Sequence, residues 1–157
     1  MHDLIPLVVF LLEGQQYALH LSSVERIAGI VEVTPLPEAP DIVLGVVNAE
    51  GRIIPAVNIR KRFGHPHREV RLSDRLILAK TSQRHLALWV DQVRGVVEAP
   101  QEGVTAAAAV VSGTRYVEGI ANLEGGVTLI HDLATFLSLE EERTLDEALQ
   151  NQSRGGS

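Results

Sequence analysis

An internal repeat constrains this chain more than any other feature of its sequence. The segment GVVNAEGRI, which begins at Gly45, returns as GIANLEGGV from Gly119, and Gly51 returns as Gly125, so that 119 − 45 and 125 − 51 both equal 74. A glycine, an asparagine and a glutamate at fixed positions between apolar runs indicate one supersecondary unit used twice. We therefore expect two related lobes, with the function at their surfaces and at the seam between them.

The repeat extends upstream at a slightly different spacing. The segment YALHLSSV from Tyr17 is echoed by LALWVDQV from Leu86, which is 86 − 17 = 69 residues later. The second repeat therefore carries about five extra residues, which we place in the alanine-rich stretch 104–114. We expect the first lobe at about 14–64 and the second at about 74–138.

Composition indicates a folded protein without a nucleic-acid partner. Of its 157 residues, 45% are hydrophobic and 22% are charged, which is enough apolar surface for a core. The net charge of −6 argues against nucleic acid, because that binding depends on neutralising phosphates. The chain has no cysteine, which excludes disulfides and thiolate chemistry and fits a reducing compartment.

The apolar N-terminal run 4–12 is expected to be a buried strand. It has no cationic lead-in, contains Pro6 and stops at Glu13, so it is too short to span a bilayer and unlike a signal peptide. We therefore expect a cytoplasmic protein with no direct membrane insertion.

Short apolar runs separated by turn residues predict strands, about five in each lobe. Gly51 supplies the positive φ that a tight hairpin needs, and Asn48 and Asn122 are expected to bond backbone groups at the mouths of the two hairpins. After each hairpin a polar residue, Asn58 or Asp132, is expected to cap a short helical segment. These signals predict two small antiparallel barrels.

The C-terminal part of the chain is expected to be helical. Ser138 and Glu141 have the spacing of a capping box, which predicts a helix over about 139–149. Residues 151–157 are polar and glycine-rich, and we expect them to be disordered. The globular part, 1–150, is expected to be a single domain.

Segments of both repeats together carry a family signature. The first repeat contains LGVVN, GRIIPAV and IRKRFG, and the second contains LWVDQV, YVEG and TLI followed by DL. In their order and spacing these segments, which span about 7–138, resemble the CheW family, the coupling proteins of bacterial chemotaxis.

The resemblance implies an all-β, mainly antiparallel fold of two intertwined SH3-like five-stranded barrels, with short helical turns and a C-terminal helix. It also implies a non-catalytic adaptor without a cofactor. Such an adaptor couples the cytoplasmic tips of methyl-accepting chemoreceptors, in membrane receptor arrays, to the regulatory domain of a CheA-type histidine kinase. No receiver or kinase sequence is attached, so a stand-alone coupler is expected, and a second copy in ring-like arrays is a further partner that this role allows.

Two other functions stay open from the sequence. A coupler of another chemosensory pathway, such as twitching motility, would have the same sequence features. A small ligand-binding or hydrolytic β-barrel would use His20, His85 or His131 and would need a deep polar pocket with converging titratable groups.

The remaining histidines and the serines give no chemical motif. His65 and His67 could lie on one side of an extended segment, but no further ligand follows at the spacing of a metal site. No serine lies in a G-x-S-x-G motif. We therefore expect no catalytic residue and no metal site.

The resemblance places two partner-binding surfaces on the chain. The receptor-binding groove would lie just after the strand 16–21, with candidate residues Leu21, Val24, Arg26, Ile27 and Glu50. The kinase-domain contact would lie in the second lobe, with candidate residues Val104, Thr105 and Val110. The loop 104–110 lacks the charged and aromatic residues that are common there in the family, so this contact is expected to be weak or missing.

A charge reversal distinguishes this chain from the family pattern. Family members commonly carry a glutamate two residues after the position of Val24 and an arginine just before the hairpin glycine. Here these positions hold Arg26 and Glu50, with both signs reversed. Reversing only one of the two signs would leave two like charges that repel each other at a partly buried seam. The reversal of both signs therefore favours a retained contact. We therefore expect an interlobe salt bridge between Arg26 and Glu50, and a partner whose matching charge is also inverted.

Overall fold

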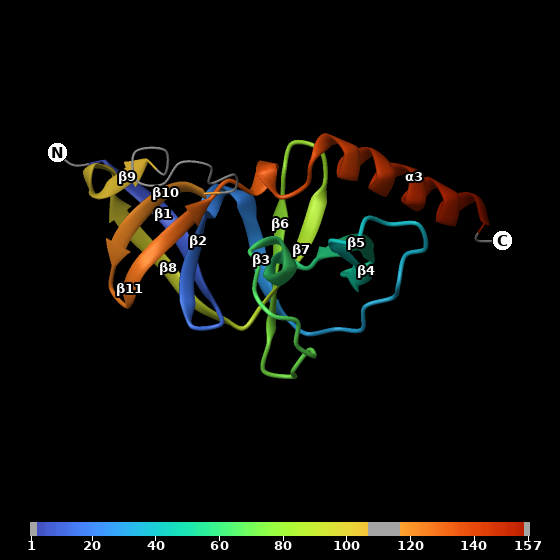
Figure 1. Ribbon diagram of the computed structural model, residues 1–157, viewed down its shortest axis with the longest axis horizontal. Coiled ribbons are helices and arrows are strands. Elements are labelled where there is room, and N and C mark those ends of the chain that lie inside the picture. Colours follow the sequence, from blue (N-terminus) through green and yellow to red (C-terminus); the bar gives the residue numbers. More distant parts are fainter. Residues whose placement is uncertain (1–2, 107–116, 156–157) are drawn as a thin grey trace.

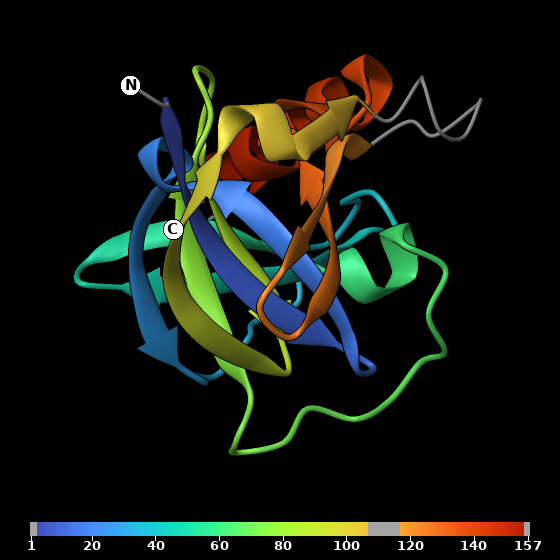
Figure 2. The same cartoon turned by 90° about the vertical axis from the view of Figure 1, so that its left-hand side faces the viewer.

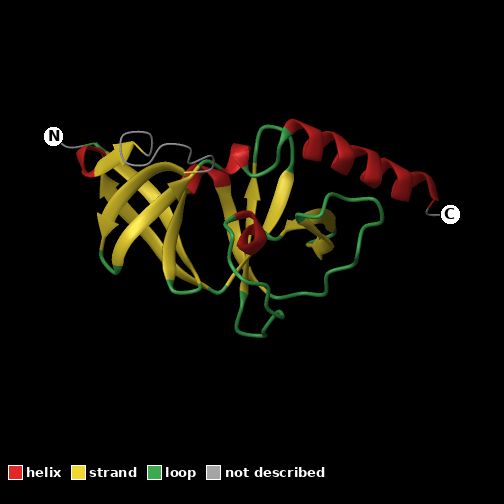
Figure 3. Ribbon diagram, in the orientation of Figure 1, coloured by secondary structure: helices red, strands yellow, loops and turns green. Residues whose placement is uncertain are grey.

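Residues 3–106 and 117–155, which this computed structural model describes, form two curved β-sheets that stand side by side (Figure 1 and Figure 3). The first sheet, here called the first barrel, has six strands in the order β8-β1-β2-β11-β10-β9. Its neighbouring strands are antiparallel except β2 and β11, which are parallel. Its strands are β1 (Leu4–Leu12), β2 (Gln15–His20), β8 (Gln92–Pro100), β9 (Val104–Ala106), β10 (Val117–Leu123) and β11 (Gly126–His131).

The second sheet, here called the second barrel, has five strands in the order β3-β6-β7-β5-β4, with one parallel pair, β5 and β7. The expected all-β and mainly antiparallel class is confirmed. Five strands are present in the second barrel, whereas the three-residue strand β9 adds a sixth to the first. The strands of the second barrel are β3 (Val24–Gly29), β4 (Val43–Ala49), β5 (Arg52–Val57), β6 (Arg75–Lys80) and β7 (His85–Val90).

The two sequence repeats exchange their hairpins, which makes the barrels intertwined. β1 and β2 belong to the first repeat but lie in the first barrel with β8–β11 of the second repeat. β6 and β7 of the second repeat lie in the second barrel with β3–β5 of the first. The lobe ranges 14–64 and 74–138 therefore each contribute strands to both barrels, because β2 pairs with β11 and β7 pairs with β5.

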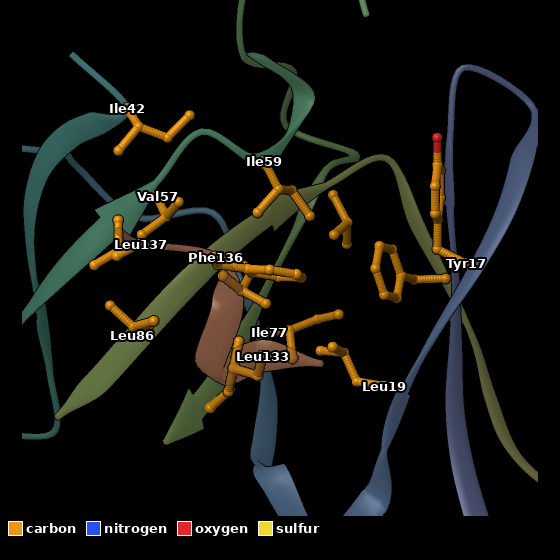
Figure 4. Packing of buried hydrophobic residues seen from close by; sticks show 14 of the residues in the cluster. Tyr17, Leu19, Ile42, Val57, Ile59, Ile77, Leu86, Leu133, Phe136 and Leu137 are labelled. Atoms are coloured by element: carbon orange, nitrogen blue, oxygen red, sulfur yellow. The ribbon is translucent and has the colours of Figure 1, made fainter. Parts of the chain in front are cut away.

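Three apolar cores follow from this arrangement, one inside each barrel and a larger one between them. Figure 4 shows Tyr17 and Leu19 of β2 on one side of the central core and Leu86 of β7 on the other. Leu133 and Phe136, from the segment that follows β11, lie between them. The central core thus joins the two barrels into one body.

The exchanged hairpins are buried on both faces, and this explains their nearly continuous apolar sequence. In β7, Leu88 faces the central core, whereas Ala87 and Trp89 belong to the core inside the second barrel. In β2, Leu19 faces the central core and Ala18 lies inside the first barrel. Alternate side chains point to opposite faces of a strand, so both sets must be apolar.

The glycine that begins each repeated segment lies at a register shift in its strand, and another segment packs closely against it. The register of β4 against β5 shifts between Val43 and Gly45, and that of β10 against β11 shifts between Val117 and Gly119. At both positions another segment packs closely: a Cβ on Gly45 would lie 2.2 Å from the carbonyl oxygen of Thr34, and one on Gly119 would lie 2.7 Å from a methyl of Val104. A side chain at either site would displace the neighbouring chain.

The hairpin between β4 and β5 has a two-residue turn with a side-chain contact at its mouth. Glu50 and Gly51 have φ angles of 53° and 84°, as a type I′ turn requires. Asn48 Oδ1 accepts a hydrogen bond of 3.1 Å from the Gly51 amide. Asn122 makes no comparable side-chain bond within the described ranges, so the expected equivalence of Asn48 and Asn122 is wrong for their contacts. The reason is that the second hairpin has a different turn, in which Gly125 has a positive φ but Glu124 does not.

Replacing Asn48 with alanine should lower the free energy of unfolding by about 0.5 to 1.5 kcal/mol, because the turn amide loses its acceptor. Asn122→Ala is the matched control and should change stability by less than about 0.5 kcal/mol. Urea denaturation of both variants measures the difference. Equal losses would show that the Asn48 bond does not stabilise the turn.

The helical segments begin at the polar residues expected to cap them. Asn58 accepts a hydrogen bond from the Lys61 amide, Asp132 accepts one from the Ala134 amide, and Ser138 and Glu141 form the reciprocal bonds of a capping box. The helical segments are α1 (Ile59–Arg62), α3 (Leu139–Gly155) and the short 3₁₀ turns η1 (Leu21–Ser23), η2 (Gln101–Gly103) and η3 (Leu133–Thr135).

Helix α3 lies along the second barrel and is longer than expected (Figure 1). Leu145 and Ala148 are buried. Arg84 anchors the helix by ion pairs with Glu142, at 2.7 Å, and with Asp146. The helix continues to Gly155, so the expected end at 149 and the disordered state of residues 151–155 are wrong. Polarity alone does not end a helix, and no strong helix breaker precedes Gly155.

Candidate protein-interaction surfaces

The residues expected to form the receptor groove lie on η1, β3 and the β4–β5 turn. Val24 packs against the central core, and Ile27 pairs with Ile77 of that core, so both side chains are on the face of β3 that looks toward the first barrel. Leu21 and Ile27 are each 38% exposed. The structure therefore leaves an apolar edge in solvent beside the junction of the two barrels.

The structure brings Arg26 and Glu50 together in an ion pair. Arg26 pairs with Leu78 of β6, whose side chain lies in the core inside the second barrel, so Arg26 is on the opposite face of β3 from Ile27. The pair does not join two lobes, as the sequence suggested. It links the two edge strands of the second barrel, β3 and β4 with its turn, which both come from the first repeat.

Further charges surround this ion pair at the mouth of the second barrel. Arg26, Glu50, Glu25 and Arg52 line a pocket of about 160 Å³. His85 Nδ1 lies 2.6 Å from a Glu25 carboxylate oxygen, and this hydrogen bond lowers the pKa of the Glu25 carboxyl. These charges therefore lie on one face of β3, and the exposed apolar surface of Ile27 lies on the other.

Reversing one charge of the pair, by Arg26→Glu or Glu50→Arg, should destabilise the chain by less than about 1 kcal/mol, because exposed ion pairs contribute little. The two side chains are 47% and 61% exposed. Reversing both should recover most of the loss, and a double-mutant cycle in urea measures the coupling. Arg26→Glu combined with Glu118→Arg, on the first barrel, is the control and should be additive. Additivity in the Arg26–Glu50 cycle would contradict an energetic contact.

The residues expected to contact the kinase lie on the edge of the first barrel. Val104 and Thr105 are in β9, which pairs with β10 and is the last strand of its sheet in the described residues. Val104 is half-buried and Thr105 is exposed. Val110 lies outside the described residues.

The histidines proposed for a ligand-binding or hydrolytic barrel do not converge on one pocket. His20 Nε2 lies 3.0 Å from a Glu118 oxygen, His85 lies beside Glu25, and His131 stacks on Phe63 at 4.2 Å between ring centroids. In 3–106 and 117–155 no three His, Asp or Glu side chains are grouped so that they could hold a metal ion. No described helix is both long and apolar enough to cross a membrane.

A buried ion network at the junction of the barrels was not predicted from the sequence. The side chain of Arg60, in α1, is 1% exposed and contacts Glu13, at 2.5 Å, and Asp91. Glu13 lies in the turn between β1 and β2, and Asp91 lies between β7 and β8. The network therefore ties a hairpin of the first barrel to the second barrel.

The connection between α1 and β6 adds the second half of this network. Arg68 forms a bidentate contact with Asp74, with N–O distances of 2.9 and 2.7 Å, and lies 2.5 Å from an Asp91 oxygen. The Trp89 indole N–H donates to Asp74 at 2.9 Å, and the Arg60 and Arg68 guanidinium carbons lie 4.8 and 5.4 Å from the centre of its ring. Each carboxylate is thus paired and hydrogen-bonded, as buried charges require.

Comparison with known proteins identifies the family. A sequence profile described as the CheW-like domain matches residues 6–148. The chain belongs to the CheW-like domain family. The fold agrees with this assignment, since a solved scaffolding protein of the family, described below, has a similar structure.

The alignments with named relatives cover most of this chain and most of each relative. The chemotaxis protein CheW of Klebsiella aerogenes is 27% identical over 146 residues, which cover 92% of this chain and 88% of that protein. The chemotaxis protein CheW of Rhizobium meliloti is 26% identical over 137 residues, which cover 86% and 88%. The crystal structure of the scaffolding protein TtCheW from Thermoanaerobacter tengcongensis is similar with a TM-score of 0.80 and 28% identity, over 88% of this chain and 96% of that one.

Proposed function

We propose that this CheW-family chain is a non-catalytic adaptor that couples the cytoplasmic tips of chemoreceptors to the regulatory domain of a CheA-type histidine kinase. The observation that carries the proposal is a pair of separate exposed surfaces on one body: the apolar edge along η1 and β3, and the β9 edge of the other barrel. An adaptor needs two such surfaces that can be occupied at once. The proposed place of action is the cytoplasm, at membrane receptor arrays, where kinase and receptor tips meet.

The apolar edge along η1 and β3 fits a helical partner. Leu21 and Ile27 present apolar surface at the junction of the barrels, and an amphipathic helix can lay its apolar stripe there. The Arg26–Glu50 pair, on the opposite face of the edge strand β3, would meet a polar part of the receptor beside that helix. Since these two charges are reversed relative to the common family pattern, the receptor is expected to carry the inverted charge opposite them.

The β9 edge fits a barrel-like partner. Thr105 is exposed on a strand that pairs on one side within the described residues. A regulatory domain that is itself barrel-shaped can dock end to end against it, with individual contacts that are weak and strengthened by avidity in an array.

The test is binding of the purified chain to a kinase regulatory domain and to a receptor cytoplasmic fragment, by calorimetry and pull-down. Ile27→Asp should abolish receptor binding and leave kinase binding unchanged, because it puts a charge into the apolar edge along η1 and β3. Thr105→Pro should weaken kinase binding alone, since proline has no backbone N–H to donate to a partner at this edge. Val127→Asp, at another exposed apolar residue, is the control. Retention of neither partner at high micromolar concentration would refute the proposal.

A further inference from the structure

A histidine at the mouth of the second barrel contacts both an acid and a base. His85 begins β7, Arg52 begins β5 and Glu25 is in β3, so three strands bring these side chains together. The β4–β5 hairpin that carries Arg52 reaches past β3 to the edge of the molecule (Figure 2). His85 Nδ1 lies 2.6 Å from a Glu25 carboxylate oxygen, and Arg52 Nη1 lies 2.9 Å from His85 Nε2 and 3.4 Å from Nδ1. The imidazole thus lies between a carboxylate and a guanidinium.

These contacts require a neutral imidazole. A carboxylate only accepts and a guanidinium only donates, so Nδ1 carries the proton that Glu25 accepts and Nε2 keeps the lone pair beside Arg52. A charged imidazole has a proton on both nitrogens. Its contact with Glu25 would then be an ion pair, whereas its contact with Arg52 would hold two cations within hydrogen-bond distance. A proton on His85 therefore favours one contact and opposes the other.

A second cation lies close to the ring on the neighbouring strand. Lys80 of β6 pairs with His85 across the two strands, and side chains at such positions are close to each other. Arg84 precedes His85 in the chain, but its guanidinium is held by Glu142 and Asp146 of α3. Lys80 therefore adds to the repulsion that Arg52 exerts on a charged ring.

The charges that line the pocket beside His85 are balanced while the ring is neutral. Arg26 and Glu50 pair with each other, and Glu25 and Arg52 are the other two charged residues of the lining. Glu25 stays ionised near neutral pH, because its hydrogen bond with His85 lowers the pKa of its carboxyl. A proton on His85 therefore gives this mouth a net positive charge.

We infer that His85 is a proton switch that holds or releases Arg52. With a neutral ring, Arg52 is held against His85 and ties the β4–β5 hairpin to β7. With a charged ring, His85 keeps Glu25, and Arg52 leaves the ring and can pair with a carboxylate of a partner at this mouth. The approach of Arg52 to Glu25, 3.8 Å, is beyond hydrogen-bond distance and does not hold it. Histidine side chains change their charge near neutral pH, and the switch does not depend on the identity of the partner.

The test is an NMR titration of the full chain, labelled with nitrogen-15, from about pH 5.5 to about pH 8.5, the range in which histidines titrate. At the upper end, the ring nitrogens of His85 should report the tautomer with its proton on Nδ1. The Nε–H signal of Arg52 should change with the same midpoint as the His85 ring. In His85→Gln, whose side chain carries no charge, the Arg52 signal should be independent of pH.

Two further variants test the opposing charges. Arg52→Ala should move the midpoint of the His85 titration to a higher pH by about 0.3 to 0.7 pH unit, because it removes a cation that opposes the proton. Glu25→Gln should move it to a lower pH, because it removes the carboxylate that favours the proton. Arg94→Ala, at an exposed arginine of β8 in the first barrel, is the matched control and should leave the midpoint unchanged.

The titration of His67, whose side chain is 76% exposed, is an internal control that should be the same in all these variants. The spectra themselves establish that each variant is folded. A proton on Nε2 instead of Nδ1 at high pH, an Arg52 signal that does not follow His85, or midpoint shifts of the same sign in Arg52→Ala and Glu25→Gln would each overturn the inference.

Discussion

Replacing Arg60 with alanine should lower the free energy of unfolding by about 3 kcal/mol, at the lower end of what breaking a buried ion pair costs. The side chain of Arg60 is 1% exposed and contacts both Glu13 and Asp91. The variant leaves these carboxylates without their shared partner and removes a guanidinium that lies over Trp89. The loss is limited because Asp91 keeps its contact with Arg68.

The measurement is urea denaturation at pH 7, together with thermal unfolding, where a loss of this size corresponds to a decrease in Tm of about 6 to 12 °C. Arg52→Ala is the matched control: its side chain is 53% exposed beside Glu25, so the loss should be at most about 1 kcal/mol. Equal stabilities of Arg60→Ala and Arg52→Ala would show that the network does not hold the barrels together.

Lowering the pH from about 6 to about 2 should remove about 2 of the roughly 2.5 kcal/mol of stability that depend on the charge of Asp74. Burial of this carboxyl favours its neutral form, but hydrogen bonds from Arg68, from the Arg71 amide and from Trp89 outweigh burial and lower its pKa to about 2. A folded-state pKa below the unfolded value means that the contribution is complete above the unfolded pKa. It is lost as the pH falls through the folded pKa.

Asp74→Asn isolates this contribution, because asparagine keeps the shape of the side chain without its charge. The variant should be less stable than wild type at pH 7 by about 2.5 kcal/mol, and the gap should close as the pH approaches 2. Urea denaturation of both proteins at pH 7, 4 and 2 measures the gap. A gap that stays constant over this range would contradict the role of the Asp74 charge.

Local signals in the sequence were sufficient for the elements of this fold. Gly51 predicted the hairpin turn, and Asn58 and Ser138 predicted helix starts, because each acts on backbone groups within a few residues. The exception is the end of α3. Its polar last turns were expected to be disordered, but helix formation is decided by the absence of breakers and by anchoring of earlier turns through Arg84.

The interaction surfaces were predictable only in part. The contact between Arg26 and Glu50 was expected from a paired departure from the family pattern, although its position within one barrel was not. The ion network escaped prediction because its members are far apart in sequence: Glu13 in the β1–β2 turn and Asp91 between β7 and β8 both meet Arg60 of α1.

The sequence by itself determined that one unit is used twice, since the repeated glycines mark the same bulge and the same close approach of a neighbouring segment in β4 and β10. Only the tertiary structure decided which strands share a barrel. A run such as Leu86–Val90 is apolar on both faces, and therefore its sequence is compatible with either sheet. The choice is made by the parallel pairing of β2 with β11 and of β7 with β5, which buries both faces of the exchanged hairpins at once.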